Sequence, residues 1–348
     1  MRPDFSITAD GKNITALLRD RLISIRITDK VGLDSDEVEI SLDDRDGAVA
    51  IPRTGAQLEV SLGYTETGLT RIGRYAVDEI ESSGPPQMLI IRARPADMAG
   101  TLKSVRKHAW EGVTLAQVVQ DIATRNKLKP VCQIKARVER LDQLNESDLH
   151  FITRVAKQYD ATATVKGGQL LVLPRGGQQK NASGKPLPVI VLNRADIKSW
   201  RYTQSERDAS GGVAVKHHDQ RSGKTLTILA PDSDNPKAPV QTTRHTVPAK
   251  GRAAASAQGA LKRSKRATKQ LTLTLAGRAD LVAERSIRAS GIKPGVDGLY
   301  PAETVTQDFS HDGWITTVEL SAGKTPPKKK ATANKQKTAK PLQKLTPP

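Results

Sequence analysis

Residues 37–42 read Glu-Val-Glu-Ile-Ser-Leu, a strict alternation of polar and apolar side chains that is typical of a β-strand with one buried face. The turn sequence Asp43-Asp44-Arg45-Asp46-Gly47 follows directly. Closely spaced strands with such turns indicate an antiparallel barrel or sandwich, which we place in residues 1–100. Three further segments fit the strand pattern: residues 24–28, 57–62 and 89–93.

Helical periodicity appears in residues 101–178. Thr114 is a candidate N-cap for a helix, and a second helix is expected to begin near Ser147. Two short strands then flank Lys166-Gly167-Gly168-Gln169, where Gly-Gly suits a tight hairpin turn. These features predict a small α/β domain inserted into a β protein.

A second β region is expected in residues 179–322, after a linker rich in Gly, Gln and Lys. It contains one basic helix, at about residues 252–268, with a thin apolar stripe. Residues 323–348 are Lys-rich, with almost no apolar side chains, and are expected to form a flexible tail. The predicted fold is therefore mainly β, with an α/β insert between two barrel-like β domains and a basic disordered C-terminal tail. The expected strands of the second region are residues 189–192, 200–202, 212–215, 270–275, 303–306 and 315–320.

The formal net charge of +18 is concentrated in two stretches. Residues 235–279 contain ten Lys or Arg and residues 324–348 contain eight Lys, and neither stretch contains an acidic residue. A solvated surface, a docking site for an acidic partner and a nucleic-acid patch all fit this charge. Neither stretch contains an aromatic side chain on which bases could stack, so nucleic-acid contact is expected only as non-specific duplex binding. The candidate docking residues are Lys262, Arg263, Lys265, Arg266, Lys328, Lys329 and Lys330.

Targeting features are absent from the sequence as it stands. The start at Met1 opens no apolar signal region, and no run of about 18 apolar residues occurs. The single cysteine, Cys132, cannot form an intrachain disulfide and is interpreted as a small core residue. We therefore expect synthesis in the bacterial cytoplasm and no membrane contact.

Three short motifs resemble catalytic or ligand sites, but each lacks a required part. Ser210 lies in an Asp-Ala-Ser-Gly-Gly stretch without a recognisable base and buried acid. The stretch from Ser222 to Thr225 ends like a phosphate loop, but His218 occupies the position where that loop needs glycine. His217 and His218 are adjacent, so in a strand they point to opposite faces and do not converge on a metal. We predict no catalytic, cofactor-binding or metal site.

An ordered set of motifs resembles the phage late control D family over about residues 4–322. It includes Gly73-Arg74-Tyr75-Ala76-Val77-Asp78-Glu79 and Gly295-Val296-Asp297-Gly298. The motif residues chosen as candidate structural positions are Asp43, Asp44, Arg45, Gly47, Pro52, Gly55, Gly84, Pro85, Glu146, Ser147, Asp148 and Phe151.

The resemblance implies a structural, non-enzymatic hub of a contractile tail, found in P2-like phages, related prophages and tail-derived bacteriocins. The family is similar to the hub of the T4 baseplate and to the matching half of type VI spike proteins. It implies a homotrimer whose two barrel-like domains per subunit make a pseudo-sixfold ring in the baseplate. That ring would join the tail tube to the trimeric spike, with tape-measure or other baseplate proteins as further partners.

Two other functions remain open on the residues alone. A DNA-binding regulator of late genes fits the charge and predicts a helix-turn-helix or a similar reading element. A tail-associated peptidoglycan hydrolase would need two carboxylates in different environments. The chain has 37 acidic residues, and none lies in a sequence context that identifies such a pair.

Overall fold

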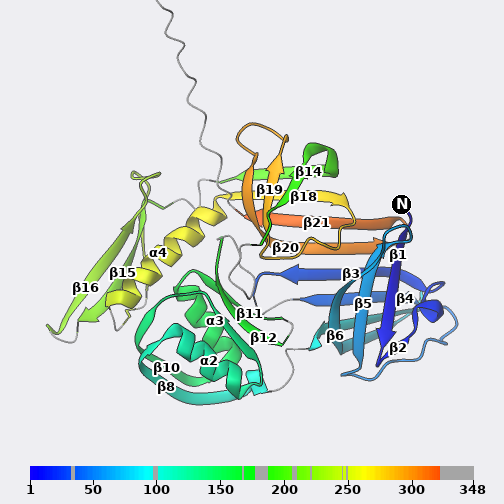
Figure 1. Ribbon diagram of the computed structural model, residues 1–348, viewed down its shortest axis with the longest axis horizontal. Coiled ribbons are helices and arrows are strands. Elements are labelled where there is room, and N and C mark those ends of the chain that lie inside the picture. The colour runs from blue at the N-terminus through cyan, green and yellow to red at the C-terminus, as the bar shows by residue number, and fades with distance from the viewer. Residues whose placement is uncertain are drawn as a thin grey trace, which may run out of the picture.

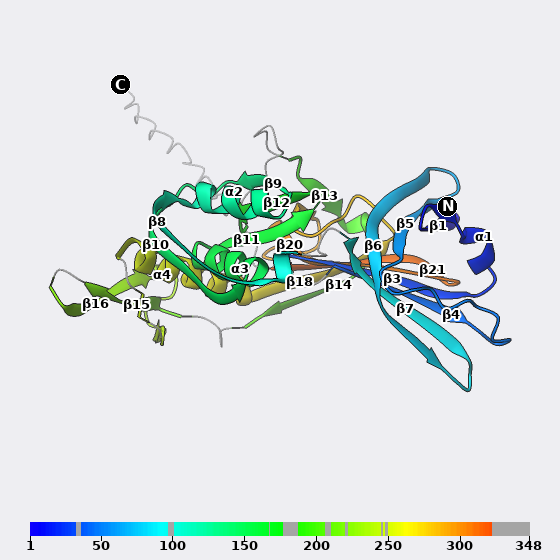
Figure 2. The ribbon, with the colours of Figure 1, turned by 90° about the horizontal axis from the view of Figure 1, so that it is seen from below.

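The computed structural model shows an elongated, mainly β protein (Figures 1 and 2). The N-terminal strands lie at one end, and the α/β insert and a basic helix with its own small sheet lie at the other. No helix in the described part of the chain is long and apolar enough to cross a membrane. The structure describes residues 1–32, 36–96, 101–166, 168–176, 187–205, 210–219, 222–244, 246–247 and 250–321.

The N-terminal β region follows the predicted alternation. Val38, Ile40 and Leu42 are buried, while the side chains between Val38 and Ile40 face the other side of the sheet. All four strands expected here lie within observed strands, β3, β4, β5 and β7. The region consists of β1 (Pro3–Ala9), β2 (Lys12–Asn13), α1 (Thr15–Leu18), β3 (Leu22–Lys30), β4 (Glu37–Asp43), β5 (Gln57–Tyr64), β6 (Gly68–Ser83) and β7 (Met88–Pro95).

The C-terminal β region is built around a hairpin that turns between Ser310 and Gly313. Its core contains Leu271, Leu273 and Val318, contributed by the alternating strands that the sequence predicted. Its elements are β13 (Ile190–Asn193), η3 (Arg194–Asp196), β14 (Ile197–Gln204), β18 (Lys269–Ala276), β19 (Ser286–Ser290), β20 (Gly298–Ser310) and β21 (Gly313–Ser321).

One feature of the sheet was not predicted: β20 pairs with β3 and joins the two β regions. Thirteen strands form one sheet, whose main path runs β14-β18-β21-β20-β3-β4-β7-β6-β5-β1-β2. The pairing aligns Phe309 with Ile25. Phe309 and Trp314, from the C-terminal hairpin, belong to the N-terminal core, where the Phe309 ring lies 5.3 Å from that of Phe5. The two β regions are therefore interlocked, which is compatible with two barrel-like domains in one subunit.

The α/β insert folds around its own core. Thr114 accepts a hydrogen bond from the backbone N–H of Gln117, and Ser147 accepts one from that of His150, so both expected helix caps are confirmed. The hairpin between β11 and β12 also forms as predicted. The insert consists of η2 (Thr101–Lys103), β8 (Val105–Thr114), α2 (Leu115–Arg125), β9 (Lys129–Cys132), β10 (Arg137–Ser147), α3 (Asp148–Gln158), β11 (Ala161–Lys166) and β12 (Gln169–Pro174).

A small unit projects beside the insert (Figure 1), and we call it the arm. It comprises β15 (Gly212–Asp219), β16 (Lys224–Pro231), β17 (Val240–Thr242) and α4 (Lys250–Ala267). The helix packs Ala253 and Ala257 against Val213 and Val215, so small side chains let it lie close to the sheet. The sequence predicted the basic helix but not that it would leave the C-terminal sheet to form this unit.

Two predicted segments fall outside the described residues. They are residues 177–186, which make up most of the linker expected at residues 176–188, and the Lys-rich tail, which includes Lys328, Lys329 and Lys330.

Candidate interaction sites

The Asp43–Gly47 motif forms a turn after β4 that is held by its own side chains. The Asp43 carboxylate accepts from the N–H of Arg45 at 2.9 Å, and the Asp44 carboxylate accepts from the N–H of Val49 at 2.9 Å. Gly47 donates to the Asp44 carbonyl at 2.8 Å and has a φ of 65°, a conformation that favours glycine. The motif therefore specifies the shape of an exposed turn.

An exposed ion pair lies beside this turn. Both guanidinium Nη atoms of Arg21 lie 2.6 Å from the Asp46 carboxylate, and this pairing holds the pKa of Asp46 well below its usual range. The other motif residues of this region also lie in loops: Pro52 and Gly55 precede β5, and Gly84 and Pro85 lie between β6 and β7. These positions present shaped loops at the N-terminal end of the molecule.

The second motif, Glu146–Asp148, begins helix α3. Glu146 pairs with Arg154 and accepts from Nδ1 of His150 at 2.8 Å. Burial raises the pKa of Glu146, but the hydrogen bonds from Arg154 and His150 outweigh this effect, and the net pKa lies below the usual value. Glu146 thus connects the end of β10 to the first two turns of α3.

Asp148 is completely buried and binds polar side chains from the end of α2 and from β10. Its carboxylate lies 3.1 Å from Nη1 of Arg125 and accepts from Asn126 at 2.8 Å and from Gln143 at 3.0 Å. One turn further along α3, Phe151 is also fully buried and stacks on Trp110 at 4.9 Å. The Glu146–Phe151 segment is therefore the internal anchor of the insert.

A charged junction connects the insert to both β regions. Nζ of Lys166, from β11, lies 2.8 Å from Oδ1 of Asp29 and 3.7 Å from Oδ2 of Asp36. The other Asp29 oxygen accepts from the backbone N–H of Ala283 at 2.8 Å. Asp29 thus contacts the insert and the C-terminal region at once. We call Asp29, Asp36 and Lys166 the junction triad.

Burial and neighbouring charge shift the pKa values of the triad. Burial raises the pKa of Asp36, the nearby Asp29 raises it further, and Lys166 only partly offsets this, so the value is about 7. Burial lowers the pKa of Lys166, but the two aspartates outweigh burial and the net pKa lies above the usual value. The triad borders a cavity of about 290 Å³ into which Tyr75 also projects from the N-terminal region.

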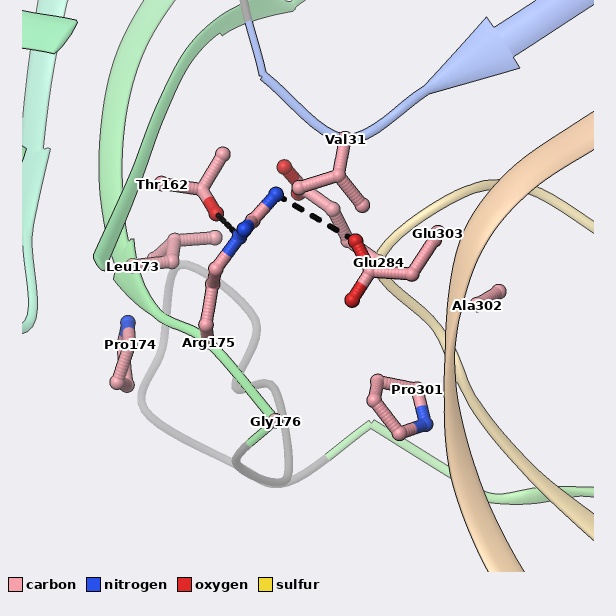
Figure 3. A pocket seen from close by; sticks show the side chains of 10 residues that line it. All are labelled: Val31, Thr162, Leu173, Pro174, Arg175, Gly176, Glu284, Pro301, Ala302 and Glu303. Carbon is pink, nitrogen blue, oxygen red and sulfur yellow. Dashed lines mark hydrogen bonds and ion pairs between the residues drawn. The ribbon is translucent and has the colours of Figure 1, made fainter. Parts of the chain in front are cut away.

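Arg175 makes a second contact between the insert and the sheet (Figure 3). Arg175, just after β12, donates to Oγ1 of Thr162 at 3.2 Å and to Glu303 of β20 at 3.4 Å. Glu303 also accepts from the Ser321 hydroxyl at 2.7 Å. Figure 3 shows Arg175 spanning the gap toward the strand that carries Glu303, with Val31 beside it. Two independent polar contacts therefore fix the insert to the large sheet.

Several predicted docking residues of the basic helix α4 form ion pairs or hydrogen bonds within the chain. Arg266 pairs with the buried Asp160, and Lys265 lies 2.6 Å from Asp232. Arg263 donates to the carbonyl of Lys157 at 2.6 Å, at the C-terminal end of α3, where cations are favoured. Lys262 is exposed, and no ion pair to it occurs in the part of the chain that the structure describes.

The motifs that resembled catalytic or ligand sites are placed in strands and turns. Ser210 is buried, with its hydroxyl 3.3 Å from that of Ser264 on α4. On β15, His217 is buried and His218 is exposed, as expected for opposite faces. Lys224 starts β16 across a hairpin turn. Among the described residues, no group of three His, Cys, Asp or Glu is placed to hold a metal ion.

The helix pair of the insert does not form the reading element expected of a DNA-binding regulator. α2 ends at Arg125 and α3 begins at Asp148, and β9 and β10 lie between them. A helix-turn-helix joins its two helices by a turn of three or four residues. The geometry of α2 and α3 therefore gives no support to sequence-specific DNA binding.

Comparison with known proteins agrees with the ordered motifs. The family described as phage tail baseplate hub (GPD) matches residues 34–313. This chain belongs to that family. The probable baseplate hub protein of Escherichia phage 186 is 35% identical over 362 residues, which cover 92% of this chain and 93% of the relative. The chain is thus a baseplate hub protein of a phage-type tail, and the virion tail is where such proteins reside.

Solved structures share the fold at low sequence identity. The 43 kDa tail protein of prophage MuSo2 from Shewanella oneidensis superposes with a TM-score of 0.69 at 17% identity, covering 91% of this chain and 98% of that protein. The c3393 protein of the E. coli type VI secretion system has a TM-score of 0.55 at 11% identity, covering 94% and 80%. That protein is described as structurally similar to the T4 tail proteins gp27 and gp5.

Proposed function

We propose that three copies of this chain close into a ring that joins the tail tube to the spike. Membership of the baseplate hub family and the shared fold with a relative of T4 gp27 and gp5 support this proposal. Each subunit supplies two β regions, so three subunits would present six, which matches a sixfold tube above and a threefold spike below. The role requires shape and contacts, and no catalytic step.

The observation that carries the proposal is the pair of unlike edges on the large sheet. Among the described residues, the main path of the sheet ends at β14 in the C-terminal region and at β1 and β2 in the N-terminal region, and β13 lies off this path beside β19. A closed ring uses heterologous contacts, in which one surface of a subunit meets a different surface of the next. Two different edges on one rigid sheet provide such a pair, and strand edges are ready sites for pairing with another chain.

The edge at β14 is incompletely covered. Trp200 aligns with Leu273, which is fully buried, so its side chain is on the core side of the sheet. Trp200 is nevertheless 37% exposed. Aromatic residues are enriched where proteins meet. We therefore assign the β14 edge, with Trp200, to the contact with a neighbouring subunit.

Native mass spectrometry of the full chain, co-expressed with its spike protein, tests this function. We expect a species containing three copies of the chain bound to the spike. Trp200→Lys should shift the population toward monomer, because it places a charge in the proposed contact. Leu226→Lys changes a comparably exposed apolar residue, 45% exposed on the arm, and should leave assembly intact. A stable monomer that never joins the spike contradicts the proposal.

A further inference from the structure

A groove of about 480 Å³ lies between α3 and α4. Its cationic or titratable lining residues are His150, Arg154 and Lys157 from α3 and Arg263 from α4. No aspartate or glutamate lines it in the part of the chain that the structure describes. A basic groove without a carboxylate concentrates positive charge in a concave, partly desolvated place, where charge complementarity has its largest effect.

Lys157 and Arg263 are the two cations of this groove that lack an acidic partner. Lys157 is exposed, and no carboxylate pairs with its ammonium group among the described residues. Arg263 donates to the carbonyl of Lys157, which occupies only one of the five N–H donors of a guanidinium. By contrast, Arg154 is already paired with Glu146. The unused binding capacity of the groove therefore resides in Lys157 and Arg263.

Burial and two neighbouring arginines make the charged form of Arg263 less favourable, so a bound anion would stabilise it. Lys157 and Arg263 also line a second cavity of about 170 Å³, together with Arg175 and Asp160. Asp160 is the carboxylate of this set, and it pairs with Arg266. Burial lowers the pKa of Arg263, the Asp160 carboxylate raises it, and the neighbouring Arg266 and Arg175 lower it again.

The size and lining of the groove favour a peptide over a single small anion. Its volume is typical of sites for ligands of several hundred daltons. Thr153, Thr243 and Ser256 line it with hydroxyl groups, and Oγ1 of Thr243 is inaccessible to solvent and has no hydrogen-bond partner among the described residues. No Phe, Tyr or Trp is among the described residues that line the groove, so these residues offer no stacking surface for bases. Guanidinium and ammonium groups bind carboxylates through charge-assisted hydrogen bonds.

We infer that the groove between α3 and α4 binds an acidic peptide segment of a partner tail protein, with Lys157 and Arg263 contacting its carboxylates. This site contains only one of the docking residues predicted on α4, Arg263, together with Lys157, which was not predicted. Lys265 and Arg266 instead form ion pairs within the chain. The inference rests on family membership for the partner being a tail protein, and it does not depend on the ring.

A fluorescent peptide of ten glutamates, titrated into the full chain at low salt, provides the first test. We expect Lys157→Glu to weaken binding about tenfold, the effect of losing roughly one charge pair. Lys157 is exposed, so this variant should fold normally, which circular dichroism verifies. Arg263→Glu should weaken binding at least as much. Lys262→Glu makes the same charge change one residue away, outside the groove lining, and should alter binding less than twofold.

A photo-crosslinking version of the same peptide locates the site. Crosslinks to α3 and α4, lost in Lys157→Glu, support the inference. Crosslinks confined to the Lys-rich tail, or an equal loss of binding in Lys262→Glu, overturn it. A short DNA duplex that binds more tightly than the peptide and loses affinity in Lys157→Glu would assign the groove to nucleic acid and overturn it. Loss of self-association in Lys157→Glu would make a second copy the occupant, which also contradicts a partner protein.

Discussion

The Glu146–Asp148 segment of the insert and the Asp43–Gly47 turn of the N-terminal region have similar residues but different roles. Both are short acidic motifs at the end of a strand. In the insert, Asp148 is completely buried and binds Arg125, Asn126 and Gln143. In the turn, Asp46 is exposed and pairs with Arg21 at the surface. Similar sequence motifs therefore hold a core together in one region and shape a surface in the other.

This difference decides what each motif contributes to stability. A buried carboxylate with several partners leaves uncompensated charge when it is removed, whereas water replaces the partner of an exposed one. The insert motif should therefore act on folding. The turn motif should act mainly on the local shape of the surface. Four measurements of unfolding test how buried and exposed acidic groups differ in their contribution to stability.

Asp148→Ala should have the largest effect. It leaves Arg125 without its carboxylate and removes the acceptor for Asn126 and Gln143, so we expect a loss of about 3–5 kcal/mol in the free energy of unfolding. Chemical denaturation measures it. Asp142→Ala is the control, because it removes a partly exposed carboxylate that pairs with Arg140 on the same strand. It should lower the free energy of unfolding by less than about 1 kcal/mol. Equal losses in the two variants would remove the contrast.

The junction triad should make stability depend on pH. The folded pKa of Asp36 is about 7, above its usual 3.8, so the folded state holds a proton that the unfolded state releases. Stability should therefore fall as pH rises from about 4 to 7 and level off above pH 7, a change on the order of 4 kcal/mol. Asp36→Asn cannot ionise and should flatten this slope.

Denaturation of the wild type and Asp36→Asn across pH 5 to 8 measures the slope. Glu37→Gln is a matched control, because it neutralises the adjacent carboxylate, outside the triad. It should keep the wild-type slope. If the stability of the wild type rose with pH, or if its fall with pH persisted in Asp36→Asn, the triad would not control the pH dependence of stability.

Gly47→Ala should lower the free energy of unfolding by about 1–2 kcal/mol. No atom would obstruct the added Cβ, so the cost is backbone strain at a φ of 65°. Gly251→Ala, in the first turn of α4, also meets open space but has an ordinary helical backbone. It should leave stability unchanged or raise it slightly. Thermal unfolding distinguishes the two, and a comparable loss at Gly251 would argue against strain.

Asp46→Asn should have the smallest effect. The Arg21–Asp46 pair is exposed, so the unfolding midpoint at neutral pH should stay within experimental error. The lowered pKa of Asp46 implies that its contribution is present above about pH 4 and is lost below that value as the carboxylate protonates. A loss approaching that of Asp148→Ala would mean that the turn is a structural anchor like the insert motif.

Local features were predictable from the sequence, and long-range ones were not. Thr114 and Ser147 cap helices because capping depends on residues three positions away, which a sequence displays directly. The resemblance marked Asp148, but its burial depends on Arg125 and Gln143 from other elements. The Lys166–Asp29 contact joins residues 137 positions apart. No periodicity reports such a pairing.

The missed strands have a similar explanation. β8 was not predicted because Trp110 is its one buried residue, so it lacks an alternating apolar pattern. β10 buries Gln143, a polar residue, among its inward positions. The pairing of β20 with β3 was not predicted. Each strand alternates polar and apolar residues whatever its neighbour is, so the alternation does not identify the partner strand. Lys157 was missed because α3 was interpreted by its apolar stripe and not by its exposed face.

We propose that this hub chain forms a ring through contacts between unlike edges of one sheet. Electron microscopy of the isolated oligomer tests it most directly. We predict closed rings with threefold symmetry and an open centre, which Trp200→Lys disperses and Leu226→Lys preserves. Compact particles with twofold symmetry, or threefold rings that persist unchanged in Trp200→Lys, would contradict the assignment of the β14 edge and the account built on it.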